Sequence, residues 1–211
     1  MADGALLSAK DKKVLTDPFL ENNPVTIQVL GICSSLAVTS QLKPSLVMGL
    51  AVMVVCAGAN LVISLIRKMI PNRVRIIIQM VVVASLVIIV DQILKAYAFD
   101  VSKQLSVFVG LIITNCIIMG RLEAFAMGNK PWPSVLDGIG NGVGYAAVIA
   151  LVGLCREFFG SGKILGFELI PPQAYEFGYV NNGFMVLPPG AFVLLGLLVW
   201  AQRTYSKYTE E

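Results

Sequence analysis

The stretch PSLVMGLAVMVVCAGANLVISLI at residues 44–66 contains no charged side chain. A helix that crosses the hydrocarbon core of a bilayer needs about 20 apolar residues, so this stretch is long enough to span a membrane. The whole chain has the same character: its 211 residues are 56% hydrophobic and 14% charged, with a mean hydropathy of +0.78. Too few charges remain to coat a soluble globule of this size. We therefore interpret the chain as an integral membrane protein and exclude soluble classes.

Charged residues divide the sequence into six windows that contain none. These windows are residues 22–42, 44–66, 76–90, 104–120, 138–155 and 177–202. Backbone groups in hydrocarbon must be paired within their own segment, and no alternating strand pattern of about ten residues is present, so the spans are predicted to be helices. The expected fold is an all-α integral membrane protein with six transmembrane helices. It has a cytoplasmic N-terminal segment (1–21), one membrane domain (22–203) and a cytoplasmic C-terminal tail (204–211).

The windows are unequal in their apolar content. The apolar part of the first runs only over residues 24–39, and the fourth, over 105–120, is interrupted by Thr114 and Asn115. Short or interrupted segments at corresponding places in two halves are typical of inverted repeats around a site at mid-membrane. Three crossings per half is an odd number, so the second half begins on the opposite side. We therefore expect two inverted three-helix repeats, the first helix of each being short or broken.

The distribution of lysine and arginine predicts the orientation. With a cytoplasmic N-terminus, 11 of the 16 basic residues fall in cytoplasmic segments. The five on the other side are Lys43, Lys95, Lys103, Arg156 and Lys163. Because basic residues favour the cytoplasmic side, both termini are predicted to lie in the cytoplasm.

Composition also excludes several kinds of chemistry. The chain has no histidine, which excludes His-ligated haem, His-based zinc sites and triads with an imidazole base. The net charge of +3 gives no reason to expect a nucleic-acid partner. The glycine-rich run at 138–144 follows no strand and is not a dinucleotide loop. Its two spaced pairs, Gly138 with Gly142 and Gly140 with Gly144, instead predict close helix packing.

Two of the four cysteines are candidate metal ligands. Cys33 and Cys116 each lie in one of the two short segments, where a half-helix can present a thiolate near mid-membrane. Iron or an iron–sulfur cluster neutralises such a thiolate by direct ligation, and a second chain would have to complete a set of four. The alternative is that both are small apolar residues of the core. That alternative is favoured for Cys56 and Cys155, which lie in longer apolar helices.

Two aspartates are candidates for a sodium pathway. Asp91 is four residues before Lys95, so the two would pair on one helical face, either as an interfacial salt bridge or as part of an ion path. Asp137 opens the glycine-rich run and is either a helix N-cap or a carboxylate that gathers a sodium ion. No catalytic residue is assigned.

Longer motifs carry a family resemblance. The segments NNPV (22–25), LGICSSLAVT (30–39), VDQILKAY (90–97), LIITNCIIMGR (111–121) and EAFA (123–126) closely resemble the D-subunit family of sodium-translocating NADH:quinone oxidoreductases. The resemblance covers residues 22–203. The membrane-embedded E subunits of Rnf-type ferredoxin:NAD oxidoreductases share the two cysteine segments. Ser34, Ser35 and the segment 90–94 resemble the quinone-reductase branch.

The resemblance implies a six-subunit complex in the bacterial inner membrane, with the A, B, C, E and F subunits as partners. This chain and its homologue, the E subunit, would pack with inverted topology and share one iron centre, a single iron or a [2Fe-2S] cluster. Cys33 and Cys116 would then be ligands, with Asp137, and secondarily Asp91, as acidic residues of the sodium pathway. Electrons would pass from NADH to flavins and ubiquinone. No flavin is expected here, because a Ser-Gly-Ala-Thr type of motif is absent, and no activity is expected from the isolated chain.

Three alternatives stay open at this point. The nearest is a Rnf-type ferredoxin:NAD oxidoreductase subunit. The second is a secondary transporter subunit whose half-helices bind a solute or ion. The third is a scaffold or ion-path subunit without a metal.

Overall fold

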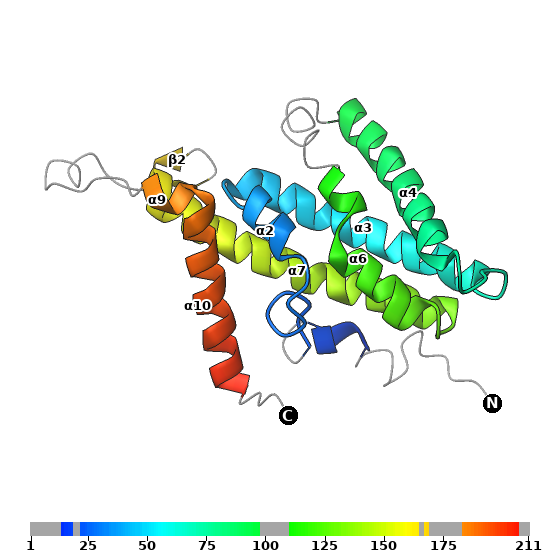
Figure 1. Cartoon of the computed structure of the whole chain (residues 1–211). Helices are drawn as coiled ribbons and strands as arrows, with labels where there is room; N and C mark the ends of the chain where they lie inside the picture. The colour runs from blue at the N-terminus through cyan, green and yellow to red at the C-terminus, as the bar shows by residue number, and fades with distance from the viewer. Residues whose placement is uncertain (1–13, 19–21, 98–109, 165–166, 169–182, 207–211) are drawn as a thin grey trace, which may run out of the picture.

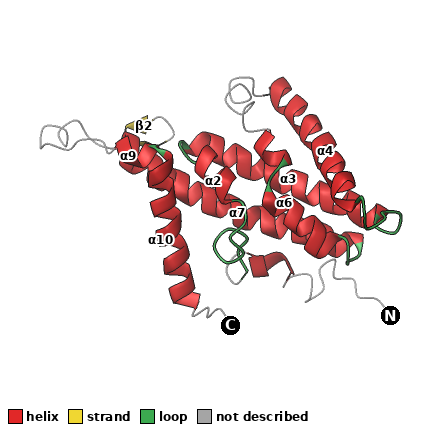
Figure 2. Ribbon diagram, viewed as in Figure 1, coloured by secondary structure: helices red, strands yellow, loops and turns green. Residues whose placement is uncertain are grey.

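The computed structural model describes residues 14–18, 22–97, 110–164, 167–168 and 183–206. The elements are α2 (Ile32–Val38), α3 (Leu42–Ile66), α4 (Arg75–Tyr97), α6 (Cys116–Arg121), the π-helical turn η1 (Leu122–Ala126), α7 (Pro131–Ser161), β1 (Lys163–Ile164), β2 (Phe167–Glu168), α9 (Gly183–Val186) and α10 (Pro188–Ser206). Most of the described residues are helical, and loops and turns connect the helices (Figure 2). Among these residues α3, α4 and α7 are long and apolar enough to cross a membrane. The prediction of a helical membrane protein is therefore confirmed, with a small addition: β1 and β2 form a two-residue antiparallel pair after α7.

The centre of the fold is the antiparallel pair α3 and α7, which lie side by side in Figure 1. Gly138 and Gly142 of α7 face α3, and a Cβ atom built at Gly142 would lie 2.6 Å from the Cα atom of Met53. Only glycine allows two helix backbones to approach so closely. The predicted packing role of this glycine pair is confirmed.

The second glycine pair faces a different neighbour. A Cβ atom at Gly140 would lie 2.8 Å from the carbonyl oxygen of Leu15, and one at Gly144 would lie 2.6 Å from that of Pro18. The helical turn at residues 14–18, part of the predicted N-terminal segment, therefore packs on α7. The two glycine pairs thus give α7 two tightly packed faces.

The remaining helices surround this pair. α4 packs along α3, while α9 and α10 pack near the end of α7 (Figure 1). A short helix precedes each central helix: α2 comes before α3, and α6 with η1 comes before α7. Two of the predicted windows, residues 104–120 and 177–202, begin outside the described residues. The count of six spans and the inversion of the repeats therefore stay predictions.

The sequence pattern places Asp137 and Arg156 at the limits of a helix, but both lie inside α7. Asp137 is not an N-cap, because α7 begins at Pro131 after the N-cap Lys130, and Asp137 lies inside the helix with 2% of its surface exposed. Arg156 is not a loop residue outside the membrane segment, because α7 continues to Ser161 and Arg156 is 1% exposed. Proline fits the first turn of a helix, and each buried charge has hydrogen-bond partners.

We expect the contact at Gly142 to be sensitive to one added methyl group. Gly142→Ala should destabilise the assembled protein by about 1–3 kcal/mol, because the new Cβ atom would meet the backbone of α3. The matched control is Gly58→Ala on α3, whose Cβ atom would lie 3.5 Å from Leu86 Cδ1, an ordinary contact. Thermal unfolding of the detergent-solubilised protein measures both. Equal melting temperatures for the two variants would contradict the close packing.

Candidate functional site

The two candidate ligand cysteines lie at the starts of the two short helices. Cys33 is the second residue of α2, and Cys116 is the first residue of α6. Both line a cavity of about 30 Å³, whose other lining residues are Ser34, Leu111, Thr114 and Asn115. The structure therefore brings together two cysteines that are 83 positions apart in the sequence.

Backbone geometry allows the two helix starts to meet. Gly31, the N-cap of α2, has a φ of 75°, a conformation that L side chains rarely adopt. A Cβ atom at this position would lie 2.5 Å from Ile117 Cδ1 on α6. Glycine is needed here for both reasons.

A polar network joins the two helix starts to each other and to α7. The Gly31 N–H donates to Cys116 Sγ at 2.9 Å. Asn115 Nδ2 donates to Ser34 Oγ at 3.3 Å, and the Tyr145 hydroxyl donates to the same oxygen at 2.8 Å. The network therefore fixes the Cys116 sulfur and the start of α2, and Tyr145 is a contributor that no sequence signal indicated.

The cysteines differ in exposure. Cys33 is exposed and Cys116 partly buried, whereas Cys56 is fully buried in the apolar core, as predicted for a packing residue. Cys155 is partly buried. No group of three or more Cys, Asp or Glu side chains suited to a metal lies in the described part of the chain. Within that part, the candidate metal site thus consists of two thiols, of which that of Cys33 is exposed on the surface of this chain.

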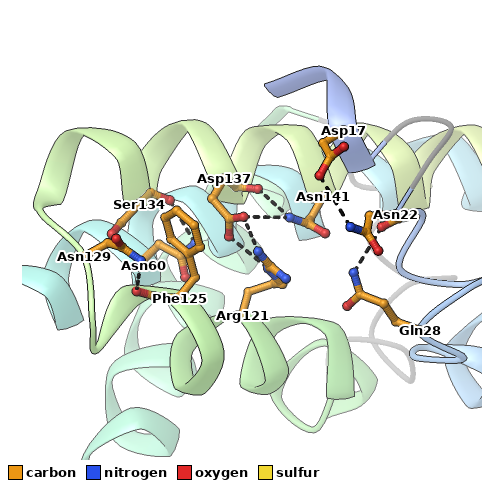
Figure 3. A network of polar contacts seen from close by, with 10 residues as sticks. All are labelled: Asp17, Asn22, Gln28, Asn60, Arg121, Phe125, Asn129, Ser134, Asp137 and Asn141. Atoms are coloured by element: carbon orange, nitrogen blue, oxygen red, sulfur yellow. Dashed lines mark hydrogen bonds and ion pairs between the residues drawn. The ribbon is translucent and has the colours of Figure 1, made fainter. Parts of the chain in front are cut away.

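Asp137 lies in a second polar cluster, which Figure 3 shows. Arg121 Nε donates to Asp137 Oδ2 at 2.9 Å, and Arg121 Nη2 pairs with Oδ1. Asn141 Nδ2 donates to Asp137 Oδ1 at 3.1 Å and to the Asp137 carbonyl oxygen at 2.9 Å. The Arg121 guanidinium also lies over the Phe125 ring, 5.5 Å from its centroid. This buried ion pair attaches the end of α6 to the first half of α7.

A cavity of about 250 Å³ adjoins the ion pair. Its lining residues are Val14, Asp17, Pro18, Asn22, Gln28, Arg121, Phe125, Asp137 and Asn141. Asn141 Oδ1 and, nearby, Asn60 Oδ1 are buried and have no hydrogen-bond partner among the described residues. Carboxylate and amide oxygens are the ligands that a hard cation such as Na⁺ prefers. The cavity therefore has suitable oxygens, but both carboxylate oxygens of Asp137 are occupied by Arg121.

Asp91 lies apart from both cavities. On α4 its Oδ2 atom is 2.6 Å from Lys95 Nζ, with Lys95 half exposed, so the predicted pairing on one helical face is confirmed. Such a pair stabilises little where water reaches it. The structure does not bring Asp91 together with Asp137.

Comparisons with known proteins agree on one family. A family model described as "Rnf-Nqr subunit, membrane protein" matches residues 12–199. The D subunit of the Na(+)-translocating NADH-quinone reductase from Aeromonas hydrophila is 62% identical over 193 residues, which cover 92% of each chain. The protein of the same name from Shewanella halifaxensis is 56% identical over 202 residues, covering 95% of this chain and 96% of its own. Another, from Pseudomonas paraeruginosa, is 56% identical over 196 residues, covering 93% of this chain and 88% of its own.

The Arg121–Asp137 pair predicts a double-mutant result. Arg121→Met should destabilise the protein by about 3–5 kcal/mol, because it leaves a buried carboxylate without its cation. Adding Asp137→Leu should recover most of the loss, since an apolar pair of similar volume carries no uncompensated charge. Denaturation of the wild type, of Arg121→Met and Asp137→Leu singly, and of the double variant measures the coupling. Additive losses in the double variant would show that the pair is not an energetic unit.

Proposed function

The chain belongs to the Rnf-Nqr family of membrane subunits, and we propose that it acts as the D subunit of a Na⁺-translocating NADH:quinone reductase. In this proposal Cys33 and Cys116 supply two of the ligands of an intramembrane iron centre. The homologous E subunit supplies the other two. Such a centre would relay electrons derived from NADH toward flavins and ubiquinone, in a complex that couples their transfer to Na⁺ export.

The observation that carries the metal proposal is the shared cavity of the two cysteines. Thiolates are soft ligands that suit iron and iron–sulfur centres, and four are usual. This chain provides two in one place, one of which is exposed where a second chain can approach. The residues present therefore fit half of such a site. When bound, the centre would supply one-electron transfer within the membrane.

The chain's own residues would hold the ligands and limit their movement. Gly31 donates its N–H to the Cys116 sulfur, and Ser34 connects α2 to Asn115 and Tyr145. Hydrogen bonds to ligand sulfurs and solvent exposure set the potential of iron–sulfur centres. In this proposal the network tunes the potential as well as the geometry.

The repeated order of a short helix followed by a long one supports an inverted repeat of two three-helix units. α2 with α3 and α6 with α7 have this order, and the two long helices run antiparallel. Inversion would place the starts of α2 and α6 on opposite approaches to one mid-membrane site. In this proposal the protein spans the bacterial inner membrane six times, and both termini lie in the cytoplasm.

Sodium movement is proposed to involve Asp137. Arg121 neutralises this carboxylate in the present arrangement. For Na⁺ to bind, Arg121 must move away, and the buried amide oxygens of Asn60 and Asn141 would then offer further ligands. Asp91, in its half-exposed pair with Lys95, is the weaker candidate. In this proposal Na⁺ is the transported substrate.

The proposed partners are the A, B, C, E and F subunits of the complex, with the E subunit the closest, together with membrane lipid. Exposed apolar side chains on α4, such as Ile76, Ile77, Ile88 and Ile89, suit lipid or a neighbouring subunit. A Rnf-type role is the alternative, because the family model covers both kinds of complex. NADH:quinone and ferredoxin:NAD activities of the parent complex distinguish the two.

Replacing either candidate ligand tests the metal proposal. Cys33→Ser and Cys116→Ser should each remove the iron signal in electron paramagnetic resonance and stop quinone reduction in a complex that still assembles. Cys155→Ser is the control and should keep both. Acid-labile sulfide measured on the wild type separates a [2Fe-2S] cluster from a single iron. Unchanged iron and turnover in the Cys33 and Cys116 variants would eliminate the metal proposal.

A second substitution tests the sodium proposal. Asp137→Asn should raise the Na⁺ concentration for half-maximal stimulation of quinone reduction by at least about tenfold. The reason is that losing the attraction between Na⁺ and the carboxylate costs more than about 1.4 kcal/mol of binding free energy. Asp91→Asn should change it by less than about twofold. Steady-state turnover as a function of Na⁺ measures both in assembled complexes. The same Na⁺ dependence in Asp137→Asn and wild type would exclude Asp137 from the pathway.

A further inference from the structure

Arg156 is the largest fully buried side chain of the described structure. Its guanidinium donates five hydrogen bonds, all to uncharged oxygens. They run from Nε to Met185 O (3.0 Å), from Nη1 to Leu36 O (3.3 Å) and Thr39 Oγ1 (2.7 Å), and from Nη2 to Val186 O (2.6 Å) and Leu187 O (3.4 Å). A buried cation is costly unless its donors are satisfied. Here every nitrogen of the guanidinium has a partner.

The acceptors belong to the ends of two short helices. Leu36 and Thr39 lie in the last turn and at the C-cap of α2, and the other three carbonyls lie at the end of α9. The last carbonyls of a helix have no partner within it, and that end carries partial negative charge. Arg156 donates hydrogen bonds to these groups and places a positive charge near the partial negative charge, because one cation caps the carboxyl ends of two helices.

The next residue along α7 caps a helix end of the opposite polarity. Glu157 Oε2 accepts a hydrogen bond from the Leu42 N–H at 2.7 Å, at the start of α3. One turn later, a Cβ atom at Gly160 would lie 2.5 Å from Val186 Cγ2, so α9 also packs closely here. The connection from α2 to α3 is therefore held on both sides by adjacent charged residues of α7.

Both ends of α2 are thus attached to α7. Ser34, near its start, accepts from Tyr145, and Leu36 and Thr39, near its end, accept from Arg156. These α7 residues are eleven positions, or about three turns, apart. Because α2 has only seven residues, a shift of its end would displace Cys33 near its start.

We propose that Arg156 is a positioning residue that sets the place of α2, and with it the separation of the Cys33 and Cys116 sulfurs. The role of that separation in metal binding rests on the proposed function. The position of α2 relative to Arg156 is independent of the proposed function. The planar fork of arginine reaches two helix ends at once, which a lysine ammonium cannot do, so lysine should substitute only in part.

The test uses the purified complex with Arg156→Met, Arg156→Lys and Thr39→Val, and with Arg73→Gln at an exposed position as the control. Two properties are measured. One is the iron signal in electron paramagnetic resonance. The other, after removal of iron with a chelator, is the rate at which dibromobimane bridges Cys33 and Cys116, followed by mass spectrometry of the linked peptides.

We expect Arg156→Met to slow bridging by at least about tenfold and to change the iron signal, since small displacements of reacting groups cost large factors in rate. Arg156→Lys should be intermediate, Thr39→Val should show a smaller effect in the same direction, and Arg73→Gln should match the wild type. Wild-type bridging and iron signal in assembled Arg156→Met would overturn the proposal. So would failed assembly of both Arg156 variants together with normal bridging in Thr39→Val, because Arg156 would then serve folding alone.

The two proposals fail in different ways. If Cys33→Ser keeps the iron of the wild-type complex, the metal proposal falls, whereas the bridging rates still decide the role of Arg156. If iron depends on Cys33 but bridging is the same in all variants, only the positioning role falls.

Discussion

The structure depends on satisfying the ends of helices that stop inside the protein. α2 and α6 are too short to cross a membrane, and in hydrocarbon terminal N–H and C=O groups need partners within the protein. Each unsatisfied group would cost about 1–3 kcal/mol. Asn115 accepts from the Ile117 N–H at the start of α6, and Arg156 donates to the Leu36 carbonyl in the last turn of α2. Several buried polar residues, namely Ser34, Ser35, Thr39 and Asn115, lie at or next to these short helices.

The same constraint explains which sequence predictions succeeded. The short, polar-interrupted segments indicated broken helices, and the structure has short helices at Ile32–Val38 and Cys116–Arg121, each beginning beside a candidate cysteine. The spacing of Gly138 and Gly142 indicated a close helix contact, and α3 approaches there. These features are local in sequence, because the helix period alone determines which residues share a face.

Predictions failed where the partner of a residue lies far away in the chain. The sequence pattern places Arg156 and Asp137 at the limits of a membrane window, since an unpaired charge in hydrocarbon is costly. Both are buried in α7 because their partners come from elsewhere: Leu36 and Thr39 are about 120 residues from Arg156, and Arg121 is 16 residues from Asp137. Nothing in the local pattern around either residue reveals such pairing. A charge at the edge of an apolar window is therefore a weak marker of a helix end in a chain whose helices break internally.

The two candidate sites share one short helix. Cys116, the first residue of α6, lines the cysteine cavity, and Arg121, its last residue, pairs with Asp137 beside the larger cavity. A helix of six residues is about 9 Å long, so Cys116 and Arg121 lie close together along the chain axis. Added negative charge at the Cys116 end would favour a rearrangement of the donors around it, and any resulting movement of α6 would act on the Arg121–Asp137 pair. The η1 turn follows directly, and π-helical turns are often found at functional sites, where they interrupt the regular hydrogen-bond ladder. In the proposed function, the candidate iron ligand Cys116 and the residue that neutralises the candidate sodium ligand thus lie at the two ends of one short helix.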